Sequence, residues 1–274
     1  MSLSPDNFKE FIGITVHTVM EFTSQREKDR AHTGRPYCLS SLTEVLLIMI
    51  YLRHYPVDLF LCVLFNASRQ TIYNTRTRVL DWLYDTLKDR LTARSLQWRL
   101  DRSVEYLSQC FTFAIDGSEQ PVLHSANSLI DTLFYSVKKK KHTVNIVVIC
   151  SLADMKVLWM SPSFPGSFND PQIVHKCNKW FGCLSSSEWG FGDSAFEGLT
   201  DYGIRVSAPP DRQSPLYSIY SKYRIKIENM FAALKNWGSV IFTLRIPPSN
   251  KDMLLDTHQK HWTIVAVLHN EYNG

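Results

Sequence analysis

The chain has 274 residues, of which 45% are hydrophobic and 20% are charged, and its formal net charge is +4 at pH 7. This composition excludes a disordered chain and favours one large domain with a smaller one, but the charge is too small to identify a nucleic-acid partner. The six cysteines form no CxxC pair, and the longest apolar run, Val45 to Leu52, is too short to cross a bilayer. We therefore expect a soluble intracellular protein that has no secretory leader and does not enter a membrane.

The first hundred residues have the pattern of a helical region. Ser41 and Glu44 fit a capping box, in which each side chain satisfies a free amide at the start of a helix. A short helix from Val57 to Phe65 should follow. Ser68 should then be the N-cap of a third helix that runs to Leu87.

The third helix carries a polar face near its N-terminus. The side chains on this face that are suited to DNA are Arg69, Gln70, Tyr73 and Arg76. In a helix-turn-helix, such residues lie against base edges and phosphates. From spacing alone, an ordinary helical bundle with a solvated polar face explains the pattern as well.

After a helical connector at about residues 97–107, the pattern changes to a mixture of strands and helices. The expected strands are Phe111 to Asp116, Val144 to Cys150, Lys156 to Met160, Trp189 to Asp193 and Gly203 to Ser207. The expected helices are Asp170 to Lys179, Leu216 to Trp237 and Asp252 to His269. We therefore expect a helical region at residues 1–105 and an α/β domain at residues 106–274.

Three acids stand where a metal site needs them. Asp116 and Asp193 close two expected strands, and Glu228 lies at the border of the packed face of the long helix. Magnesium and manganese prefer oxygen ligands, and two ions about 4 Å apart can activate an attacking oxygen and stabilise a leaving one. Three such acids that converge would support two-metal phosphoryl chemistry, but spacing alone favours a surface pair of Arg224 with Glu228.

Other charged residues near these acids are candidates for supporting roles. Arg224 and Lys235 flank Glu228 on the helix and can hold phosphate oxygens. The four lysines Lys138, Lys139, Lys140 and Lys141 lie beside an expected strand, where they would neutralise the DNA backbone; a solubilising loop is the alternative. Asp170 heads a helix, which is typical of a cap or dipole partner, and it is also a candidate helper for the metals.

His258 and His261 form a short HxxH pair on the last expected helix. Metal binding by such a pair requires a further ligand, and the sequence suggests none. We therefore expect these two histidines to form a surface pair.

Several segments of the chain resemble transposases of the Harbinger type. They are Ala114 to Val122, Phe134 to Thr143, Pro165 to Pro171, Gly192 to Phe196, Tyr223 to Phe231 and Ala233 to Lys235. They follow the family's order and cover about residues 40–272. Leu52 to Pro56 and Phe65 to Ser68 resemble the helix-turn-helix segment that precedes the nuclease domain there. Two positions depart from the family: Asn169 stands where a histidine is frequent, and Phe196 stands where tyrosine is usual.

The resemblance implies a ribonuclease-H-like mixed sheet of about five strands with helices on both faces, after an all-α helix-turn-helix region. It also implies that Asp116, Asp193 and Glu228 are the catalytic metal ligands of a DDE endonuclease, which binds two Mg²⁺ or Mn²⁺ ions. Water would then free a 3′-hydroxyl at a transposon end, and that hydroxyl would attack target DNA.

The partners implied are DNA, a separate Myb-like DNA-binding protein and a second copy of the chain, in the nucleus of a eukaryote or otherwise in the cytoplasm. Two alternatives to a transposase stay open. One is a domesticated relative that binds DNA or regulates without cutting it. The other is a plain structure-specific nuclease. Cutting followed by joining distinguishes the transposase from both.

Overall fold

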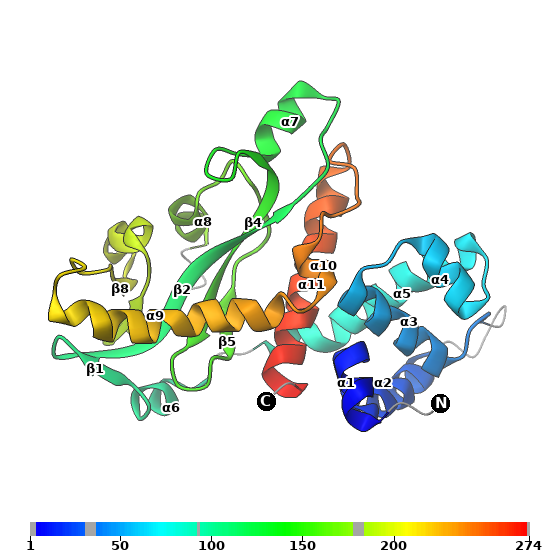
Figure 1. The fold of residues 1–274 in the computed structure, drawn as a ribbon, viewed down its shortest axis with the longest axis horizontal. Coiled ribbons are helices and arrows are strands. Elements are labelled where there is room, and N and C mark those ends of the chain that lie inside the picture. Colours follow the sequence, from blue (N-terminus) through cyan, green and yellow to red (C-terminus); the bar gives the residue numbers. More distant parts are fainter. Residues whose placement is uncertain (1–3, 31–36, 92–93, 178–183, 273–274) are drawn as a thin grey trace. The chain divides into compact units, whose positions relative to one another are not determined.

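The computed structural model describes residues 4–30, 37–91, 94–177 and 184–272 (Figure 1). The chain divides into two compact units. Unit 1 contains Met1–Asp89, Lys235–Phe242 and Lys260–Gly274, and unit 2 contains Arg90–Leu234 and Thr243–Gln259. A single cut at residue 105 does not reproduce this division, because two segments from the C-terminal part of the chain pack with the N-terminal helices.

Unit 1 is helical. Its helices are α1 (Pro5–Ile12), α2 (Val16–Asp29), α3 (Ser41–His54), α4 (Asp58–Phe65), α5 (Arg69–Leu87), α10 (Gly238–Ile241) and the second half of α11 (Lys251–Tyr272), and η1 (Lys88–Arg90) follows α5. The side chain of Ser68 accepts a hydrogen bond from the amide of Thr71 at the start of α5, which confirms the predicted N-cap. Helix α3 begins one residue earlier than expected: its N-cap is Ser40, which accepts the amide of Thr43.

Glu44 is not part of a capping box. Its side chain is fully buried, and its carboxylate pairs with three arginines. Arg26 lies 2.9 Å away and Arg30 lies 3.1 Å away, and Arg78 of α5 also donates to it. A buried carboxylate requires such partners. Glu44, which was expected to cap α3, therefore forms ion pairs that join α2, α3 and α5.

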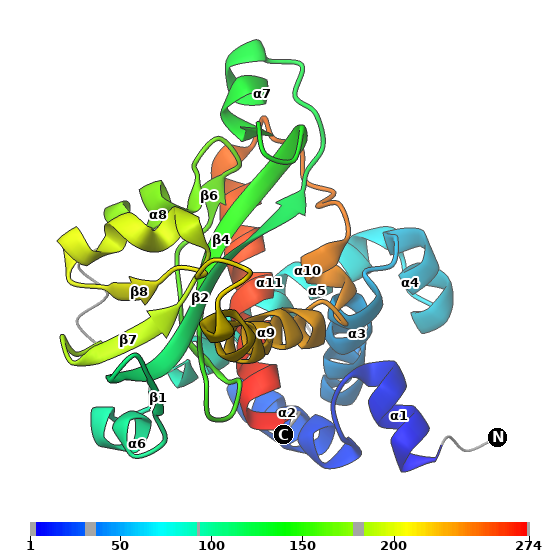
Figure 2. The same ribbon diagram turned by 60° about the vertical axis from the view of Figure 1, so that its left-hand side comes forward.

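Unit 2 is built on a mixed sheet (Figures 1 and 2). Its strands are β1 (Val104–Tyr106), β2 (Gln109–Pro121), β3 (Tyr135–Ser136), β4 (Lys141–Ser151), β5 (Val157–Met160), β6 (Phe164–Pro165), β7 (Glu188–Phe191) and β8 (Arg205–Ser207). Strand β2 is central, because it pairs antiparallel with β4 and parallel with β7. The order β3-β4-β2-β7-β8 confirms the expected α/β fold.

Strand β2 is longer than its sequence suggests. It continues five residues beyond Asp116 to Pro121, paired throughout with β4, so Asp116 lies inside the strand and does not close it. The expected helical connector before it is also shorter. It consists of α6 (Leu96–Leu100) and is followed by β1, which forms a hairpin with β2.

Helices cover both faces of the sheet. Alternate side chains of β2, including Phe113 and Ile115, form a core with α8 (Asp170–Lys176) and the 3₁₀ segment η3 (Ser194–Tyr202). Because side chains alternate along a strand, Ala114 and Asp116 point to the opposite face. That face is covered by α9 (Pro215–Leu234), which packs on β2, β4 and β7. A further short helix, α7 (Ser128–Phe134), lies between β2 and β3.

The pair His258 and His261 is buried, so the expectation of a surface pair was wrong. His258 Nδ1 lies 2.6 Å from Ser163 Oγ within unit 2. His261 packs against the rings of Tyr51 in α3 and of Tyr55, the C-cap of α3, within unit 1, and burial lowers the pKa of His261 to about 3. Both imidazoles are thus parts of packed interiors.

None of the helices formed by the described residues is long and apolar enough to cross a membrane. The five cysteines that the structure describes are all free thiols.

Candidate active site

Asp116 lies in β2, and Asp193 lies two residues past the end of the neighbouring parallel strand β7, which stops at Phe191 and not at Asp193 as expected. The register pairs Ala114 of β2 with Phe191 of β7, and each acid follows two residues later. Neighbouring strands lie about 4.8 Å apart, so the two carboxylates meet at one level of the sheet. The Phe191 ring contacts Tyr223 of α9, so this position of β7 faces α9, as Asp116 does.

Each of these two acids is oriented by a local hydrogen bond. Asp116 Oδ1 accepts the amide of Gly117 at 2.9 Å. Asp193 is the N-cap of η3 and accepts the amide of Ala195 at 3.0 Å. These local bonds orient the two carboxylates, and Arg224 of α9 also contacts Asp116.

Helix α9 brings Glu228 to the same edge of the sheet. Tyr220, Arg224 and Glu228 are spaced by four residues and therefore share one stripe of the helix. The Tyr220 hydroxyl donates to the carbonyl oxygen of Gly192, just before Asp193. Glu228 is the most exposed of the predicted metal ligands, with 60% of its side chain accessible.

Arg224 lies between two of the predicted metal ligands. Its guanidinium donates to Asp116 Oδ2 at 2.7 Å, and another of its nitrogens lies 3.7 Å from Glu228 Oε1. Burial disfavours the charge of Arg224, but the effect of Asp116 outweighs it and raises the pKa of the guanidinium. Arg224 therefore neutralises part of the negative charge that the acids bring together.

The Tyr220 hydroxyl links α9 to the segment that carries Asp193, through its hydrogen bond to Gly192. Burial raises the pKa of Tyr220 to about 12, and the negative charges of Asp193 and Asp116 act in the same direction. The hydroxyl is therefore protonated at neutral pH and can donate this bond.

Asp170 approaches the same strand from the other face. A Cβ atom placed on Gly117 would overlap Asp170 Oδ1, so the acid lies directly against the residue that follows Asp116. Asn145 donates to Asp170 at 2.9 Å, and Lys138 Nζ lies 3.7 Å away. Burial raises the pKa of Asp170, and Asp116 and Asp193 raise it further. Because Asp170 lies on the other face of β2 from Asp116, its position favours a supporting role over direct binding of a metal together with Asp116.

The donor set of Asp116, Asp193 and Glu228 fits a hard divalent cation, because it consists of carboxylate oxygens alone. Among the described residues, however, the only group of three such ligand atoms within 4.8 Å of one another is His124, Asp131 and His142. The carboxylate oxygens of Asp116, Asp193 and Glu228 therefore do not all lie within 4.8 Å of one another.

Two family models match the chain. A model of DDE superfamily endonucleases matches residues 115–270, which is more than half of the chain. A model of the helix-turn-helix of DDE superfamily endonucleases matches residues 37–89, which include α3, α4 and α5. The chain belongs to the DDE superfamily endonucleases. No curated protein and no solved structure matches it.

In this DDE superfamily endonuclease, the two departures from the Harbinger pattern have structural roles. Asn169 caps α8: its side chain accepts the amide of Gln172, and the Gln172 side chain accepts the amide of Asn169 in return. Phe196 is fully buried in the core between the sheet and η3. Neither residue contributes an atom to the three predicted metal ligands.

The helix-turn-helix presents a smaller basic face than its sequence suggests. Arg69, Gln70 and Tyr73 are exposed near the start of α5. Arg76 pairs with Asp58 of α4, and Arg78 pairs with the buried Glu44. Arg69 is thus the arginine of this stretch with an exposed side chain and no ion pair among those found in the described residues.

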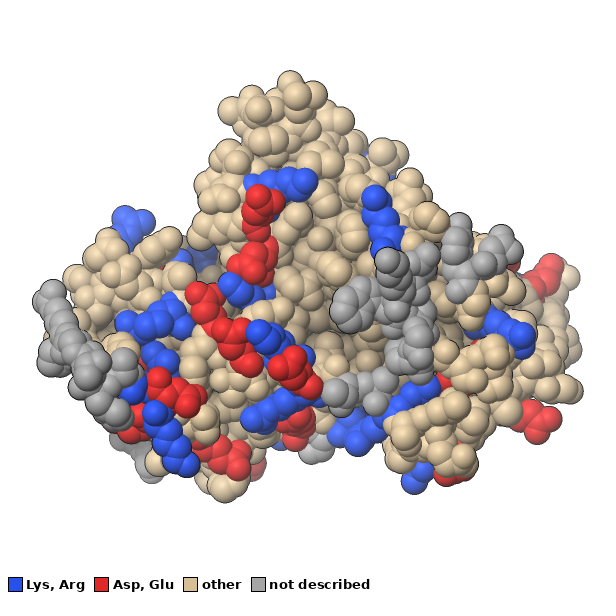
Figure 3. Space-filling model, turned by 180° about the vertical axis from the view of Figure 1, so that it is seen from behind, with Lys and Arg blue, Asp and Glu red and all other residues tan. Residues whose placement is uncertain are grey.

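The predicted phosphate-binding lysines lie in two places. Lys138, Lys139 and Lys140 form the turn between β3 and β4, where Lys141 begins β4, and all four are exposed. Lys138 faces Asp170 at 3.7 Å, so this end of the turn lies beside the acids. Lys235 follows the last residue of α9 and is partly buried. On the face in Figure 3, basic and acidic side chains lie beside one another and form no continuous basic surface.

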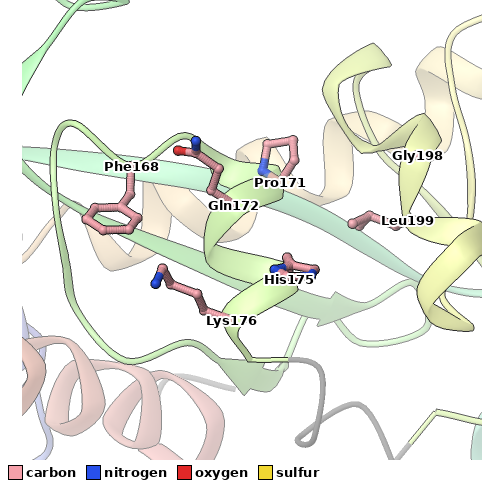
Figure 4. Close-up of a pocket in the computed structure, with 7 residues that line it drawn as sticks. All are labelled: Phe168, Pro171, Gln172, His175, Lys176, Gly198 and Leu199. Carbon is pink, nitrogen blue, oxygen red and sulfur yellow. The ribbon is translucent and has the colours of Figure 1, made fainter.

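An open cavity of about 510 Å³ lies on the face of the sheet that α8 and η3 cover (Figure 4). Its lining residues are Phe168, Pro171, Gln172, His175, Lys176, Gly198 and Leu199. None of the predicted metal ligands lines it, although α8 begins at Asp170 and η3 follows Asp193.

Two relationships in the site were not foreseen. The expectation for Arg224 was a phosphate contact, but in the structure it pairs with Asp116. The hydrogen bond of Tyr220 to Gly192 was not foreseen either. The four-residue spacing of Tyr220 from Arg224 could have indicated that the two side chains share one face of the helix. The group of His124, Asp131 and His142 has no sequence motif that could have revealed it.

Proposed function

We propose that this DDE superfamily endonuclease is a Harbinger-type transposase that cuts DNA at transposon ends and joins the freed 3′-hydroxyl to target DNA. The observation that carries this proposal is that Asp116 and Asp193 each follow a paired residue of the parallel strands β2 and β7 by two positions, while Arg224 of α9 contacts both Asp116 and Glu228. Such a placement of three acids suits two Mg²⁺ or Mn²⁺ ions.

In this proposal Asp116, Asp193 and Glu228 hold the two ions. The ions, when bound, polarise the attacking oxygen and stabilise the leaving oxygen of the phosphodiester. Tyr220 keeps Gly192 and hence Asp193 in place. Arg224 pairs with Asp116, and its planar guanidinium is suited to a DNA phosphate once that carboxylate has another partner.

The same proposal assigns DNA positioning to basic and polar residues of both units. Arg69, Gln70 and Tyr73 of α5 would contact base edges and phosphates in the major groove. Arg76 would act mainly through its pair with Asp58, which fixes α5 against α4. The lysines at 138–141, with Arg224 and Lys235, would bind the DNA backbone, and Asp170 would orient Lys138.

Partners and location belong to the same hypothesis. Cutting two transposon ends together favours a second copy of the chain, and the small exposed basic face of α5 leaves room for a separate Myb-like protein to add DNA affinity. The proposed location is the nucleus in a eukaryote and the cytoplasm otherwise.

Cleavage and joining of a terminal-repeat duplex in Mg²⁺ or Mn²⁺ tests this function. We expect the wild type to cut and join, and Asp193→Asn to bind the duplex without cutting it. Glu105→Gln, an exposed acid of β1, is the matched control and should cut normally. Equal cutting by wild type and Asp193→Asn would refute the metal-ligand assignment. Cutting without joining would indicate a plain nuclease, and binding without cutting by the wild type would indicate a domesticated relative.

A further inference from the structure

Three potential metal ligands converge at the far end of β4 from Asp116. His142 lies in β4, Asp131 lies in α7, and His124 lies in the loop between β2 and α7. Asp116 pairs with Val148, six residues further along β4 than His142. At about 3.3 Å per residue, the cluster lies about 20 Å along the strand from the predicted active site.

Backbone hydrogen bonds bring the three side chains together. The amide of Val122 donates to the carbonyl oxygen of His142 at 3.0 Å, which places the loop carrying His124 beside β4. The amide of Ser125 donates to Asp131 Oδ1 at 3.0 Å. These two bonds hold the loop that carries His124 beside β4 and beside Asp131.

The distances suit a tetrahedral ion. His142 Nε2 lies 2.9 Å from Asp131 Oδ2, and His124 Nδ1 lies 3.7 Å from Asp131 Oδ1. Zinc binds imidazole nitrogen and carboxylate oxygen at about 2.0–2.2 Å, so the ligands of a tetrahedral site stand roughly 3.3–3.6 Å apart. The two measured distances lie on either side of that range.

One ring nitrogen of the buried His142 has no polar partner. The side chain of His142 is only 6% exposed, and its Nδ1 has no hydrogen-bond partner in the described part of the chain. Its Nε2 lies 2.9 Å from Asp131 Oδ2 and pairs with that carboxylate. A buried polar atom without a hydrogen bond is costly, and a metal ion that takes an imidazole nitrogen as a ligand would remove such a cost.

We propose that His124, Asp131 and His142 bind one divalent transition-metal ion of the Zn²⁺ type, with water at the open fourth position. Two imidazoles and one carboxylate form a borderline-soft donor set, which zinc favours over magnesium. The predicted active site offers carboxylate oxygens only and favours the opposite choice. The two sites therefore differ in position and in metal preference.

The ion would fasten α7 and the loop before it to β4. In Figures 1 and 2, α7 lies at one end of the long β2–β4 pair. His142 directly follows the lysine turn at residues 138–141, and it pairs with Tyr135 of β3. A metal at His142 would thus steady the hairpin that presents Lys138 to Asp170.

Zinc binding by the purified full-length protein tests the proposal. The protein is stripped with a chelator, titrated with Zn²⁺ by calorimetry, and assayed for zinc retained after gel filtration. We expect one zinc per chain at this site. His124→Gln should weaken binding by more than tenfold, because loss of even a residue that only supports a ligand costs about 10–100-fold in affinity. His124 is 80% exposed, so this change does not threaten folding.

Matched variants separate this site from other metal binding. His17→Gln removes an imidazole that is 85% exposed and far along the chain, and it should retain zinc binding. The double variant Asp116→Asn, Asp193→Asn should also retain it, because those residues belong to the other proposed site. Hydrogen exchange of residues 122–142 should slow on adding zinc to the wild type and not to His124→Gln. Equal zinc affinity of wild type and His124→Gln, or no zinc binding by the wild type, would overturn the proposal.

Discussion

The guanidinium of Arg224 lies 2.7 Å from the carboxylate of Asp116, so a cation already occupies one side of a predicted metal ligand. A metal ion that binds Asp116 must compete with this contact or share the carboxylate with it. The pair should therefore stabilise the protein when no metal is bound and lower its affinity for a metal. Removing Arg224 should have the opposite effect on both quantities.

Arg224→Gln should destabilise the metal-free protein by about 1.5–3 kcal/mol, the range for a hydrogen bond to a charged group. It should also increase the affinity for Mn²⁺, because the acids lose their neutralising cation. Thermal unfolding with and without Mn²⁺ measures both effects. Arg212→Gln, an exposed arginine before α9, is the control and should change neither. A Mn²⁺ affinity of Arg224→Gln below that of the wild type would contradict the proposed competition.

Asp170→Asn should stabilise the metal-free protein at neutral pH. The pKa of Asp170 is raised above its ordinary value of 3.8, mainly by burial, so keeping the carboxylate ionised costs stability. This cost is absent below pH 3.8 and grows as pH rises through the higher folded-state pKa. Asparagine keeps the oxygen that accepts from Asn145 and removes the charge.

The measurement is the Tm difference between Asp170→Asn and wild type from about pH 4 to pH 7. Each kcal/mol shifts Tm by about 2–4 °C in a protein of this size, so the change is within reach of calorimetry. The difference should be largest at pH 7 and shrink towards pH 4. A difference that grows as the pH falls would contradict the prediction.

Glu188→Gln should destabilise unit 2 by about 3–5 kcal/mol, because it leaves a buried arginine without its counter-charge. Arg99 donates twice to Glu188, at 2.7 Å each, and both side chains are buried. Burial disfavours the ionised carboxylate, but Arg99 and the other donors outweigh it and lower the pKa of Glu188 below 4.5.

Denaturant unfolding at pH 7 measures the loss, with Glu105→Gln as the exposed control. Since the folded-state pKa is lowered, the stabilisation is present above pH 4.5 and disappears as the pH falls through the folded-state value. The difference between wild type and Glu188→Gln should therefore shrink in acid. A variant as stable as the wild type at pH 7 would show that the pair contributes little.

Arg69→Ala and Arg76→Ala should have opposite kinds of effect on the helix-turn-helix. Arg69 is exposed, so its removal should weaken DNA binding, reduce the salt dependence by about one phosphate contact and leave stability unchanged. Arg76 pairs with Asp58, so its removal should lower the stability of unit 1. Fluorescence anisotropy across a salt series and thermal unfolding distinguish the two. Unchanged DNA affinity of Arg69→Ala would exclude it from the DNA interface.

The sequence predicted helices and strands well where a periodic apolar pattern met a clear boundary signal. Helix α5 begins after Ser68 and ends at Leu87 as expected, and its apolar stripe is buried. The prediction failed where long-range pairing decides. Strand β2 runs past Asp116 because β4 pairs with it as far as Pro121, and nothing local to that segment shows the partner.

The same distinction applies to the candidate site. The spacing of Tyr220, Arg224 and Glu228 on one stripe could be read from helical periodicity. The pairing of Arg224 with Asp116 could not, because it joins residues from two elements far apart in the chain. For the same reason the sequence made Arg76 look available to DNA, whereas Asp58 of α4 pairs with it.

Helix α11 continues from unit 2 into unit 1 without a break, and it contributes Trp262 to the interior. Trp237, from the segment after α9, also packs in unit 1, against Gly13. A chain that stops before residue 235 would retain the entire helix-turn-helix sequence and still lack both of these aromatic side chains. The integrity of the region encoded first therefore depends on the residues encoded last, and premature termination would impair it even with the recognition helix intact.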